Sequence, residues 1–316
     1  MVSYLIRRIL IGIPVLLGVT LINFLIINLA PGSPADLYLS PTATPEDVAR
    51  TEAALGLDKP VFVQYLNWLT QLLHGNLGVS FQNREPVTQL IADRIGPTLL
   101  LMGTSLVVAY LVAIPIGIFA ARRRNTAADY GVVGASFLGI SVPHFFLGLA
   151  MIYVFALTLG WFPTGGMVTL GRGGGFADRV SHLVLPVVVL ATAVAAGMVR
   201  YVRSSMIDAF GQDYIRTAKA KGLGASVITN KHALRNALIP VVTVIGVDLS
   251  ALIGGAIVTE QIFQWPGIGL LTIQSIGARD YAVLMGINLI AAIAVFTANL
   301  LTDIAYAVVD PRVAYA

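Results

Sequence analysis

The chain has 316 residues, of which 57% are hydrophobic and 11% charged, and its formal net charge is +4. Soluble chains carry about 25% charged residues. A deficit of this size is what exposure to lipid produces, because each charge at the centre of a membrane helix costs about 2.5–3.5 kcal/mol. The chain has no cysteine, so disulfides and thiolate metal sites are excluded. The composition therefore predicts an all-α membrane protein whose apolar spans pack as one helical bundle.

Six segments have the length of about 20 apolar residues that a membrane-crossing helix requires. They are approximately residues 9–29, 97–120, 131–160, 183–199, 238–258 and 282–301. Pro143 lies inside the third segment and predicts a kink there. The first segment also has features of a signal peptide cut near Ala30 or Ala35. Its apolar core is longer than the roughly 7–15 residues of a signal, which favours an uncleaved span.

Lysine and arginine near the span ends indicate the orientation, because short cytoplasmic loops carry an excess of them. If both termini are cytoplasmic, the cytoplasmic side receives Arg7, Arg8, Arg122, Arg123, Arg124, the seven basic residues between 200 and 235, and Arg312. Three regions follow. Residues 1–30 hold the N-terminus and first span, and residues 31–96 form an extracytoplasmic segment. Residues 97–316 form the core transmembrane domain, with a cytoplasmic loop at about 203–240.

The extracytoplasmic segment contains helix signals. Thr44 precedes Pro45 as a predicted N-cap, and this helix is expected to end near Gly56. A second helix is predicted over residues 62–73, and residues 89–95 form a short helix that enters the second span. Two interpretations stay open for these helices: they cap the outer surface of the bundle, or they help to dock an extracytoplasmic partner.

The cytoplasmic loop is patterned as two short helices. The first is predicted over residues 213–221, with Ile215 and Ala218 on one side, and Gly222 suits the left-handed conformation that ends a helix. The second starts near Ser226 and aligns an apolar face, formed by Val227, Leu234 and Leu238. From this pattern alone the loop either docks a soluble partner or is a basic loop attracted to anionic lipid.

The residues of this loop resemble the coupling loop of ABC-importer permeases, in particular the peptide/nickel branch. The resemblance rests on the strings Arg216-Thr217-Ala218-Lys219-Ala220-Lys221-Gly222 and His232-Ala233-Leu234-Arg235-Asn236-Ala237-Leu238-Ile239-Pro240. The general family pattern begins with Glu-Ala-Ala and ends with Ile-x-Leu-Pro. Here Arg216-Thr217-Ala218 stand at the start, and the ending Leu238-Ile239-Pro240 follows a longer gap, a departure that is usual in the peptide branch.

The resemblance extends over nearly the whole chain and is to the first permease subunit of dipeptide and oligopeptide transporters. Its further motifs are Ala30-Pro31-Gly32, Gly56-Leu57-Asp58-Lys59-Pro60, Gly75-Asn76-Leu77-Gly78, Pro97-Thr98, Phe263-Gln264-Trp265-Pro266-Gly267, Arg279-Asp280-Tyr281 and Asp310-Pro311-Arg312. Each motif is weak by itself, and their order and spacing together are specific.

The resemblance implies a type I ABC-importer bundle of six helices in a bacterial or archaeal cytoplasmic membrane. The implied partners are a second homologous permease, two cytoplasmic ABC ATPases that carry ATP and Mg, and an extracytoplasmic substrate-binding protein. The chain itself would hold no catalytic residue, cofactor or metal. The implied substrate is a dipeptide or oligopeptide, and nickel chelate, glutathione and oligosaccharide are alternatives. The ATPase-coupling residues would be Arg216, Thr217, Ala218, Lys219, Ala220, Lys221, Gly222 and Leu223.

Two further groups of residues are candidates for the transport path. An outer gate or a contact with the binding protein is expected at Glu260, Phe263, Trp265, Pro266, Arg279 and Asp280. Asp248 lies mid-span, so it must face protein or water, either at the path or in an interhelical hydrogen bond. His144 either lines the path or is satisfied by a neighbouring helix. The small residues Gly246, Gly254, Gly255 and Ala256 permit tight helix packing and could equally form a permease–permease interface.

Other classes of protein lack support in the sequence. No G-x-x-x-x-G-K-[ST] loop is present, and the glycine-rich residues 171–175 are interpreted as a flexible connection. No two histidines have metal-ligand spacing. An ion-coupled secondary transporter would show internal repeats, and none is found. A membrane-embedded enzyme would have only Ser136, Ser141, His144 and Asp248 to work with, without a supporting motif.

Overall fold

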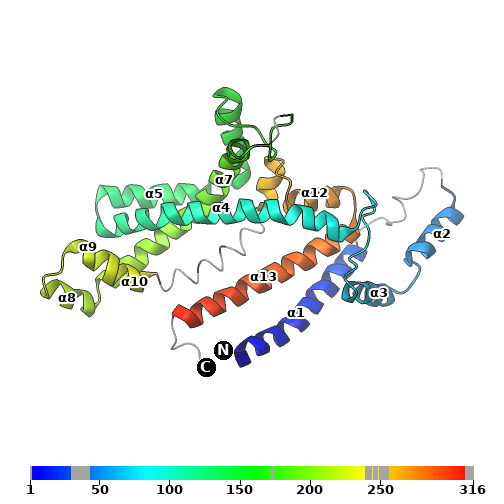
Figure 1. Cartoon of the computed structure of the whole chain (residues 1–316), viewed down its shortest axis with the longest axis horizontal. Helices are drawn as coiled ribbons and strands as arrows, with labels where there is room; N and C mark the ends of the chain where they lie inside the picture. Colours follow the sequence, from blue (N-terminus) through cyan, green and yellow to red (C-terminus); the bar gives the residue numbers. More distant parts are fainter. Residues whose placement is uncertain are drawn as a thin grey trace. The chain divides into compact units, whose positions relative to one another are not determined.

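The computed structural model describes residues 2–29, 43–171, 174–238, 244, 248 and 256–309. Within these ranges the chain is helical, and Val79 and Pro86 form an isolated bridge. In chain order (Figure 1) the elements are α1 Val2–Asn28, α2 Pro45–Leu55, α3 Val61–Leu73, α4 Val87–Arg122, α5 Ala127–Ser141, α6 His144–Met151, the π-helix η2 Ile152–Thr158, α7 Phe176–Phe210, α8 Asp213–Ala220, α9 Ala225–Val227, the π-helix η3 Ile228–Ala233, α10 Leu234–Ala237, α12 Ile268–Gly277 and α13 Tyr281–Val309. Contacts divide the chain into two compact units, one of residues 1–98 and 266–297 and one of residues 99–265 and 298–316.

The first unit has a core between the start of α4, α12 and α13. Its buried side chains are Leu77, Val87, Leu90, Ile91, Leu271, Val283, Ile287 and Leu289. Gly286 lets α13 approach α4 closely, since a Cβ there would stand 2.7 Å from Cγ1 of Val87. Helix α1 joins α13 through Asn288, whose amide donates to Asn23 Oδ1 at 3.5 Å.

The first helix of the extracytoplasmic segment, α2, is bounded as the sequence predicts. Thr44 is its N-cap, with Oγ1 accepting from Asp47 N at 3.3 Å, and Asp47 Oδ2 accepts from Thr44 N at 3.1 Å. Thr44 Oγ1 also donates to Asp47 Oδ2 at 2.7 Å. This hydrogen bond, followed by that from Thr44 N, holds the pKa of the Asp47 carboxyl below its usual value. Gly56 ends the helix with φ 70°, in the left-handed region that glycine occupies at little cost.

The second unit is built on close contact between α7 and its neighbours α4 and α5. A Cβ at Gly117 of α4 would stand 2.8 Å from Cβ of Val202, and one at Gly139 of α5 would stand 3.0 Å from Cβ of Ala196. Packing by small residues is the usual way in which helices associate in lipid, where the hydrophobic effect between helices is absent. The glycines therefore set the distance between α7 and these two helices.

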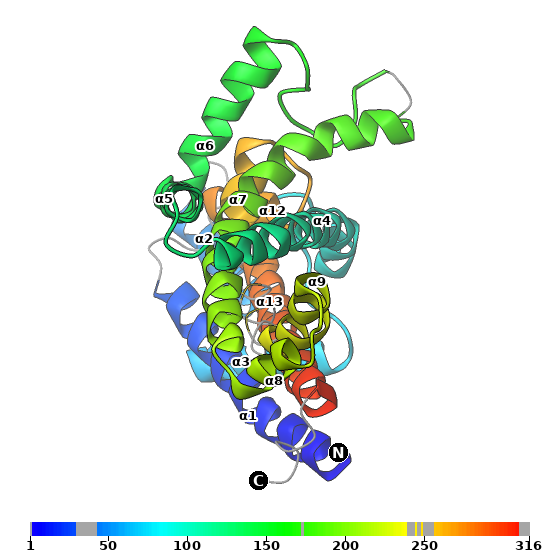
Figure 2. The same cartoon turned by 90° about the vertical axis from the view of Figure 1, so that its left-hand side faces the viewer.

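The third predicted span is broken rather than gently kinked. Helix α5 ends at Ser141, α6 begins at His144, and the two directions differ by 97°. Figure 2 shows the chain turning between α5 and α6. Pro143 is the N-cap of α6, and its ring restricts the residue before it to extended backbone. The predicted kink at Pro143 is confirmed, and its angle is much larger than a proline inside a continuous helix would give.

Four described helices are long and apolar enough to cross a membrane, and the broken pair α5–α6 could supply a fifth crossing. They are residues 6–28, 87–122, 176–210 and 281–304. Most of the predicted span 238–258 lies outside the described residues, so six crossings stay a prediction. Two helices exceed their predicted spans: α4 absorbs the short helix predicted at 89–95, and α7 continues to Phe210, so Arg203 lies in a helix and not in the cytoplasmic loop.

An ion pair that the sequence analysis missed joins α5 to α7. Arg203 donates to both carboxylate oxygens of Asp129, from Nε at 2.5 Å and from Nη2 at 2.6 Å. The Asp129 side chain is 1% exposed and that of Arg203 is 24% exposed. Asp129 Oδ2 also accepts from Asn125 N at 3.0 Å, and Thr126 caps the same helix. The spacing Thr126-x-x-Asp129 signals the start of α5 in the sequence, but it does not indicate the Arg203 partner.

We expect Asp129→Ala to destabilise the chain by about 3–5 kcal/mol, because it leaves the Arg203 charge partly buried without its partner. The measurement is thermal unfolding of the purified chain in detergent. The matched control is Arg50→Ala, which breaks the Arg50–Glu46 pair, whose side chains are 75% and 77% exposed. Exposed pairs of this kind contribute about 0–1 kcal/mol. Equal shifts in Tm for the two variants would contradict a structural role for the Asp129–Arg203 pair.

Candidate functional site

The predicted coupling residues lie on a small helical projection from the C-terminal end of α7. Helix α8 spans Asp213–Ala220, close to the predicted 213–221, with Asp213 in its first turn and Lys219 in its last. Both charges complement the helix dipole. Gly222 has φ 73°, so the left-handed position predicted for it is confirmed. A second helical stretch begins at Ala225, next to the predicted start, and continues through η3 and α10.

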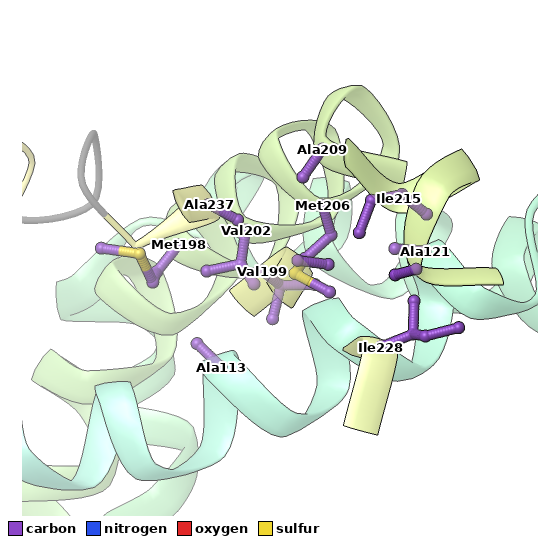
Figure 3. Packing of buried hydrophobic residues seen from close by; sticks show 12 residues of the cluster. Ala113, Ala121, Met198, Val199, Val202, Met206, Ala209, Ile215, Ile228 and Ala237 are labelled. Carbon is purple, nitrogen blue, oxygen red and sulfur yellow. The ribbon is translucent and has the colours of Figure 1, made fainter. Parts of the chain in front are cut away.

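One face of this projection is buried against the membrane helices. Ile215 is fully buried and Ala218 is 5% exposed. Figure 3 shows the cluster that contains them, in which α8, η3 and α10 meet α7 and α4. The cluster consists of Ala113, Ala121, Met198, Val199, Val202, Met206, Ala209, Ile215, Ala218, Ile228, Ala233 and Ala237. Burying one isoleucine stabilises the packed state by about 1.5–3 kcal/mol, so this face anchors the projection firmly.

The opposite face of α8 and the turn after it are exposed. The exposed residues of the predicted coupling set are Arg216, Thr217, Lys219, Ala220, Lys221, Gly222 and Leu223. Beside them lies an open hollow of about 520 Å³, whose lining includes Arg122, Phe210, Lys219 and Leu223. Ala218 differs from the others, since its small side chain allows α8 to approach the chain's own helices. A partner that touches this surface therefore meets a basic, mostly small-residue face.

The apolar face predicted for the second helix is shifted in the structure. Val227 is 44% exposed, whereas Ile228, Ala233 and Ala237 are buried. Leu234 and Leu238 are only partly buried at the edge of the cluster. The reason is the π-helical segment η3, in which each turn holds an additional residue and the side-chain register moves. The prediction assumed regular α-helical spacing and was wrong on this face.

The predicted gate residues between 260 and 265 form a buried turn. Glu260 and Trp265 are fully buried and Phe263 is 1% exposed. Trp265 packs in a cluster with Leu101, Met102, Val187, Leu190 and Ala256. The side chains of these three residues are therefore parts of the interior in this conformation, whereas Gln261 and Gln264 are exposed.

The turn is held by an outer loop that sequence reasoning did not connect with it. Gly166 N donates to the Phe263 carbonyl oxygen at 2.7 Å. A Cβ at Gly165 would overlap that same oxygen, so only glycine fits there. His182 of α7 fixes the loop, with Nδ1 2.9 Å from the Gly165 oxygen and Nε2 3.2 Å from Thr169 Oγ1.

Asp178 completes this network, which we call the outer-loop clamp: Gly165, Gly166, Thr169, Asp178 and His182. Thr169 donates to Asp178 from Oγ1 at 2.6 Å and from N at 2.8 Å. The clamp ties the start of α7 to the Glu260–Trp265 turn through partly buried, directional hydrogen bonds. Its sequence signal is faint: an Asp and a His four residues apart at a helix start.

The last two predicted gate residues lie in the first unit and differ from each other. Arg279 is exposed, with φ 53°. Asp280 is 1% exposed and caps α13, accepting from Val283 N at 3.3 Å. It also accepts from Ser80 Oγ at 2.5 Å and from Gln82 N at 3.3 Å. The Asp280 carboxylate therefore fastens the turn around residues 79–86 to the start of α13.

The predicted path residues are placed only in part. Tyr110 of α4 donates to Asp248 Oδ2 at 2.9 Å, which supplies the interhelical hydrogen bond considered for this acid. His144 stands at the start of α6, and its Nδ1 is buried with no hydrogen-bond partner among the described residues. Gly246, Gly254 and Gly255 lie outside the described residues, whereas Ala256 is buried beside Trp265. Over the part of the chain that is described, no three His, Asp or Glu residues gather as a metal site.

Comparisons with known families agree with this architecture. The family of binding-protein-dependent transport system inner membrane components matches residues 113–315, and the N-terminal family of the same membrane components matches residues 1–102. The chain therefore belongs to the family of binding-protein-dependent transport system inner membrane components.

Three relatives match over essentially their whole length. The oligopeptide transport system permease protein AppB of Bacillus subtilis (strain 168) is 46% identical over 316 residues, 100% of each chain. The glutathione transport system permease protein GsiC of Salmonella typhimurium (strain LT2) is 41% identical over 315 residues, again 100% of each. The dipeptide transport system permease protein DppB of Escherichia coli (strain K12) is 38% identical over 335 residues, 99% of each.

A chain of the MetNI methionine ABC transporter, solved in an inward-facing conformation, has a similar fold. The TM-score is 0.58 at 19% identity, over 71% of this chain and 97% of that chain. The chain is thus a helical, multi-pass inner-membrane permease with the type I ABC-importer fold, and it is a transport subunit. The predicted family and inner-membrane location are confirmed.

We expect Gly165→Ala to destabilise the chain by about 1–3 kcal/mol, because the added methyl group overlaps the Phe263 carbonyl oxygen and must displace the turn. Thermal unfolding in detergent measures this. Gly197→Ala in α7 is the control, since a Cβ at Gly197 meets nothing within 4 Å. If Gly165→Ala unfolds at the same temperature as Gly197→Ala, the outer-loop clamp does not hold the turn.

Proposed function

We propose that the chain is one of two permease subunits of an ATP-driven importer that takes up short peptides delivered by an extracytoplasmic binding protein. The observation that carries this proposal is the anchored projection α8–α10. It presents an exposed basic face to one side while its apolar face is buried in the inner ends of α4 and α7. A cytoplasmic ATPase that grips this face moves α7 directly, because no flexible linker lies between them.

The remaining parts of the proposed complex follow the family. A second, homologous permease encloses the path together with this chain, and two ABC ATPases carry ATP and Mg. Six crossings with both termini in the cytoplasm place the basic loops on the ATPase side, in agreement with the excess of Lys and Arg there. Asp248 and His144 are proposed to face the path. An outer gate or a contact with the binding protein is proposed at Glu260, Phe263, Trp265, Pro266, Arg279 and Asp280.

The substrate class rests on the relatives. Oligopeptide and dipeptide permeases are both similar along the whole chain, and these names support short peptides. Glutathione is the second candidate, because a glutathione permease is 41% identical over 315 residues. Glutathione is itself a modified tripeptide, so the two candidates share a peptide backbone with charged ends.

Purification of the tagged chain from its native membrane in mild detergent tests the assembly. We expect a second multi-pass permease and P-loop ATPases to accompany it, and ATP-dependent uptake of labelled peptides after reconstitution with the binding protein. Competition by excess glutathione then separates the two substrates. Uptake by this chain alone, without ATP, would overturn the importer assignment and favour an ion-coupled carrier.

Charge reversal on the exposed face of α8 tests the coupling surface. For Lys219→Glu with Lys221→Glu we expect about tenfold lower recovery of the ATPase, a loss of about 1.4 kcal/mol of binding free energy, with unchanged thermal stability. The control is Lys59→Glu, an exposed lysine of the extracytoplasmic segment. Normal ATPase recovery with the double variant would remove these lysines from the contact.

Ala220→Trp and Ala218→Trp separate the two faces of the same helix. The first places a bulky group on the exposed face, and we expect ATPase recovery to fall while the chain stays folded. The second forces an indole into a buried site, and we expect Tm itself to fall. The same effect of both variants on Tm would contradict the assignment of faces.

A further inference from the structure

Helix α3 belongs to the predicted extracytoplasmic segment, yet it packs against α1 inside the apolar membrane span of α1. Tyr65 of α3 is buried, and its hydroxyl lies 3.0 Å from Thr20 Oγ1 and donates to the Leu17 carbonyl oxygen at 3.3 Å. The Tyr65 ring also contacts that of Phe24, with centroids 5.5 Å apart. Thr20, Leu17 and Phe24 all belong to the apolar membrane span of α1.

The position of these contacts along α1 gives the depth of α3. The span runs over residues 6–28, with Arg8 near its inner end and Asn28 at its outer end. At a rise of about 1.5 Å per residue, Thr20 lies about 12 Å inward of Asn28. The hydrocarbon core of a bilayer is about 30 Å thick. The Tyr65 hydroxyl therefore reaches hydrocarbon depth, and its ring lies beside Phe24, about 6 Å inward of Asn28.

The apolar and polar side chains of α3 lie on different sides of the helix, as a position in the outer half of the membrane requires. Tyr65 and Leu72 face the protein. Next to them around the helix runs an exposed apolar stripe of Phe62, Leu66 and Leu73, which are 65%, 43% and 80% exposed. These three residues, four and seven positions apart, lie on one line of an α-helix.

The opposite side of α3 is polar but carries no charge. It holds Gln64, Asn67 and Gln71. Gln64 Nε2 donates to the carbonyl oxygens of Leu57 and Lys59, at 3.0 and 2.8 Å, so this side faces the connection to α2. Lys59 and Asp58 are the nearest charges before the helix, and none occurs from Val61 to Leu73. A segment without charge can enter lipid without the cost of burying one.

We propose that α3 is embedded in the outer half of the lipid bilayer, with the stripe Phe62–Leu66–Leu73 against lipid acyl chains. Helix α1 also exposes apolar side chains along its span, with Ile22, Leu25 and Ile26 58%, 44% and 60% exposed. The depth of the Tyr65 contacts along that span favours lipid over a protein partner as the occupant of the stripe. The inference depends on the membrane location of the chain and not on the transported substrate.

The absence of cysteine allows a direct test with single-cysteine variants of the full chain. Spin labels are placed at Phe62→Cys and Leu66→Cys on the stripe, and at Asn67→Cys and Gln71→Cys on the polar side as matched controls. The chain is purified with its accompanying subunits and reconstituted in vesicles of phosphatidylethanolamine and phosphatidylglycerol. Electron paramagnetic resonance then compares collisions with oxygen, which concentrates in lipid, and with a water-soluble nickel chelate.

We expect the ratio of oxygen to nickel collisions to reverse between the two sides of α3, with oxygen dominant at residues 62 and 66 and nickel dominant at 67 and 71. Nickel dominance at all four positions would place α3 in water and overturn the proposal. Protection of residues 62 and 66 from both reagents would also overturn it, because a protein partner would then cover the stripe.

Discussion

The second unit depends on the close packing of α7. Of the candidate membrane spans, α7 is the most buried, with 56% of its apolar window inside the protein against 11% for α1. Glycines at 117 and 139 bring α4 and α5 to within backbone contact of it. The charge of Arg203 on its inner third is tolerated because Asp129 neutralises it with two hydrogen bonds. Without that pair, the charged group of Arg203 would remain unpartnered at the helix interface.

Helix α7 carries a different attachment at each end. At its outer end, the outer-loop clamp connects Asp178 and His182 to the Glu260–Trp265 turn. At its inner end, Met206 and Ala209 lie in the cluster that anchors α8. The helix is 35 residues long, about 52 Å at a rise of about 1.5 Å per residue. In the proposed importer, α7 thus links the ATPase contact to the Glu260–Trp265 turn as one helix, with Pro186 inside it.

The two helices of the predicted extracytoplasmic segment differ, because α2 carries charged residues and α3 carries none. Helix α2 has a capping box and exposed charges, as expected of a helix in water. Helix α3 has no charge and contacts α1 inside its membrane span. The two interpretations left open by the sequence, a cap on the bundle and a dock for a partner, both assumed an aqueous setting. Insertion of α3 in lipid leaves α2, and not α3, as the water-facing surface of this region.

Much of the architecture could be predicted because it depends on local chemistry. Helix boundaries at Thr44, Gly56 and Gly222 were correct, since caps and left-handed turns are fixed by a few neighbouring residues. The apolar spans that fall within the described residues were predictable for a similar reason: the cost of charge in lipid acts residue by residue. The coupling strings were recognisable as a family resemblance, which the comparisons confirmed at the level of the family.

The remaining features depend on contacts between residues far apart in the chain. The ion pair of Asp129 with Arg203 depends on a second helix that no local pattern specifies. The same holds for the burial of Trp265 and Glu260 and for the burial of Ala218. The side-chain register of the π-helix η3 was not predicted, because periodicity arguments assume a regular α-helix. Sequence alone thus determined most of the described helical segments, the long apolar spans among them and the family they form. Tertiary structure decided which face of each helix meets protein, since that follows from packing partners brought together only in the folded chain.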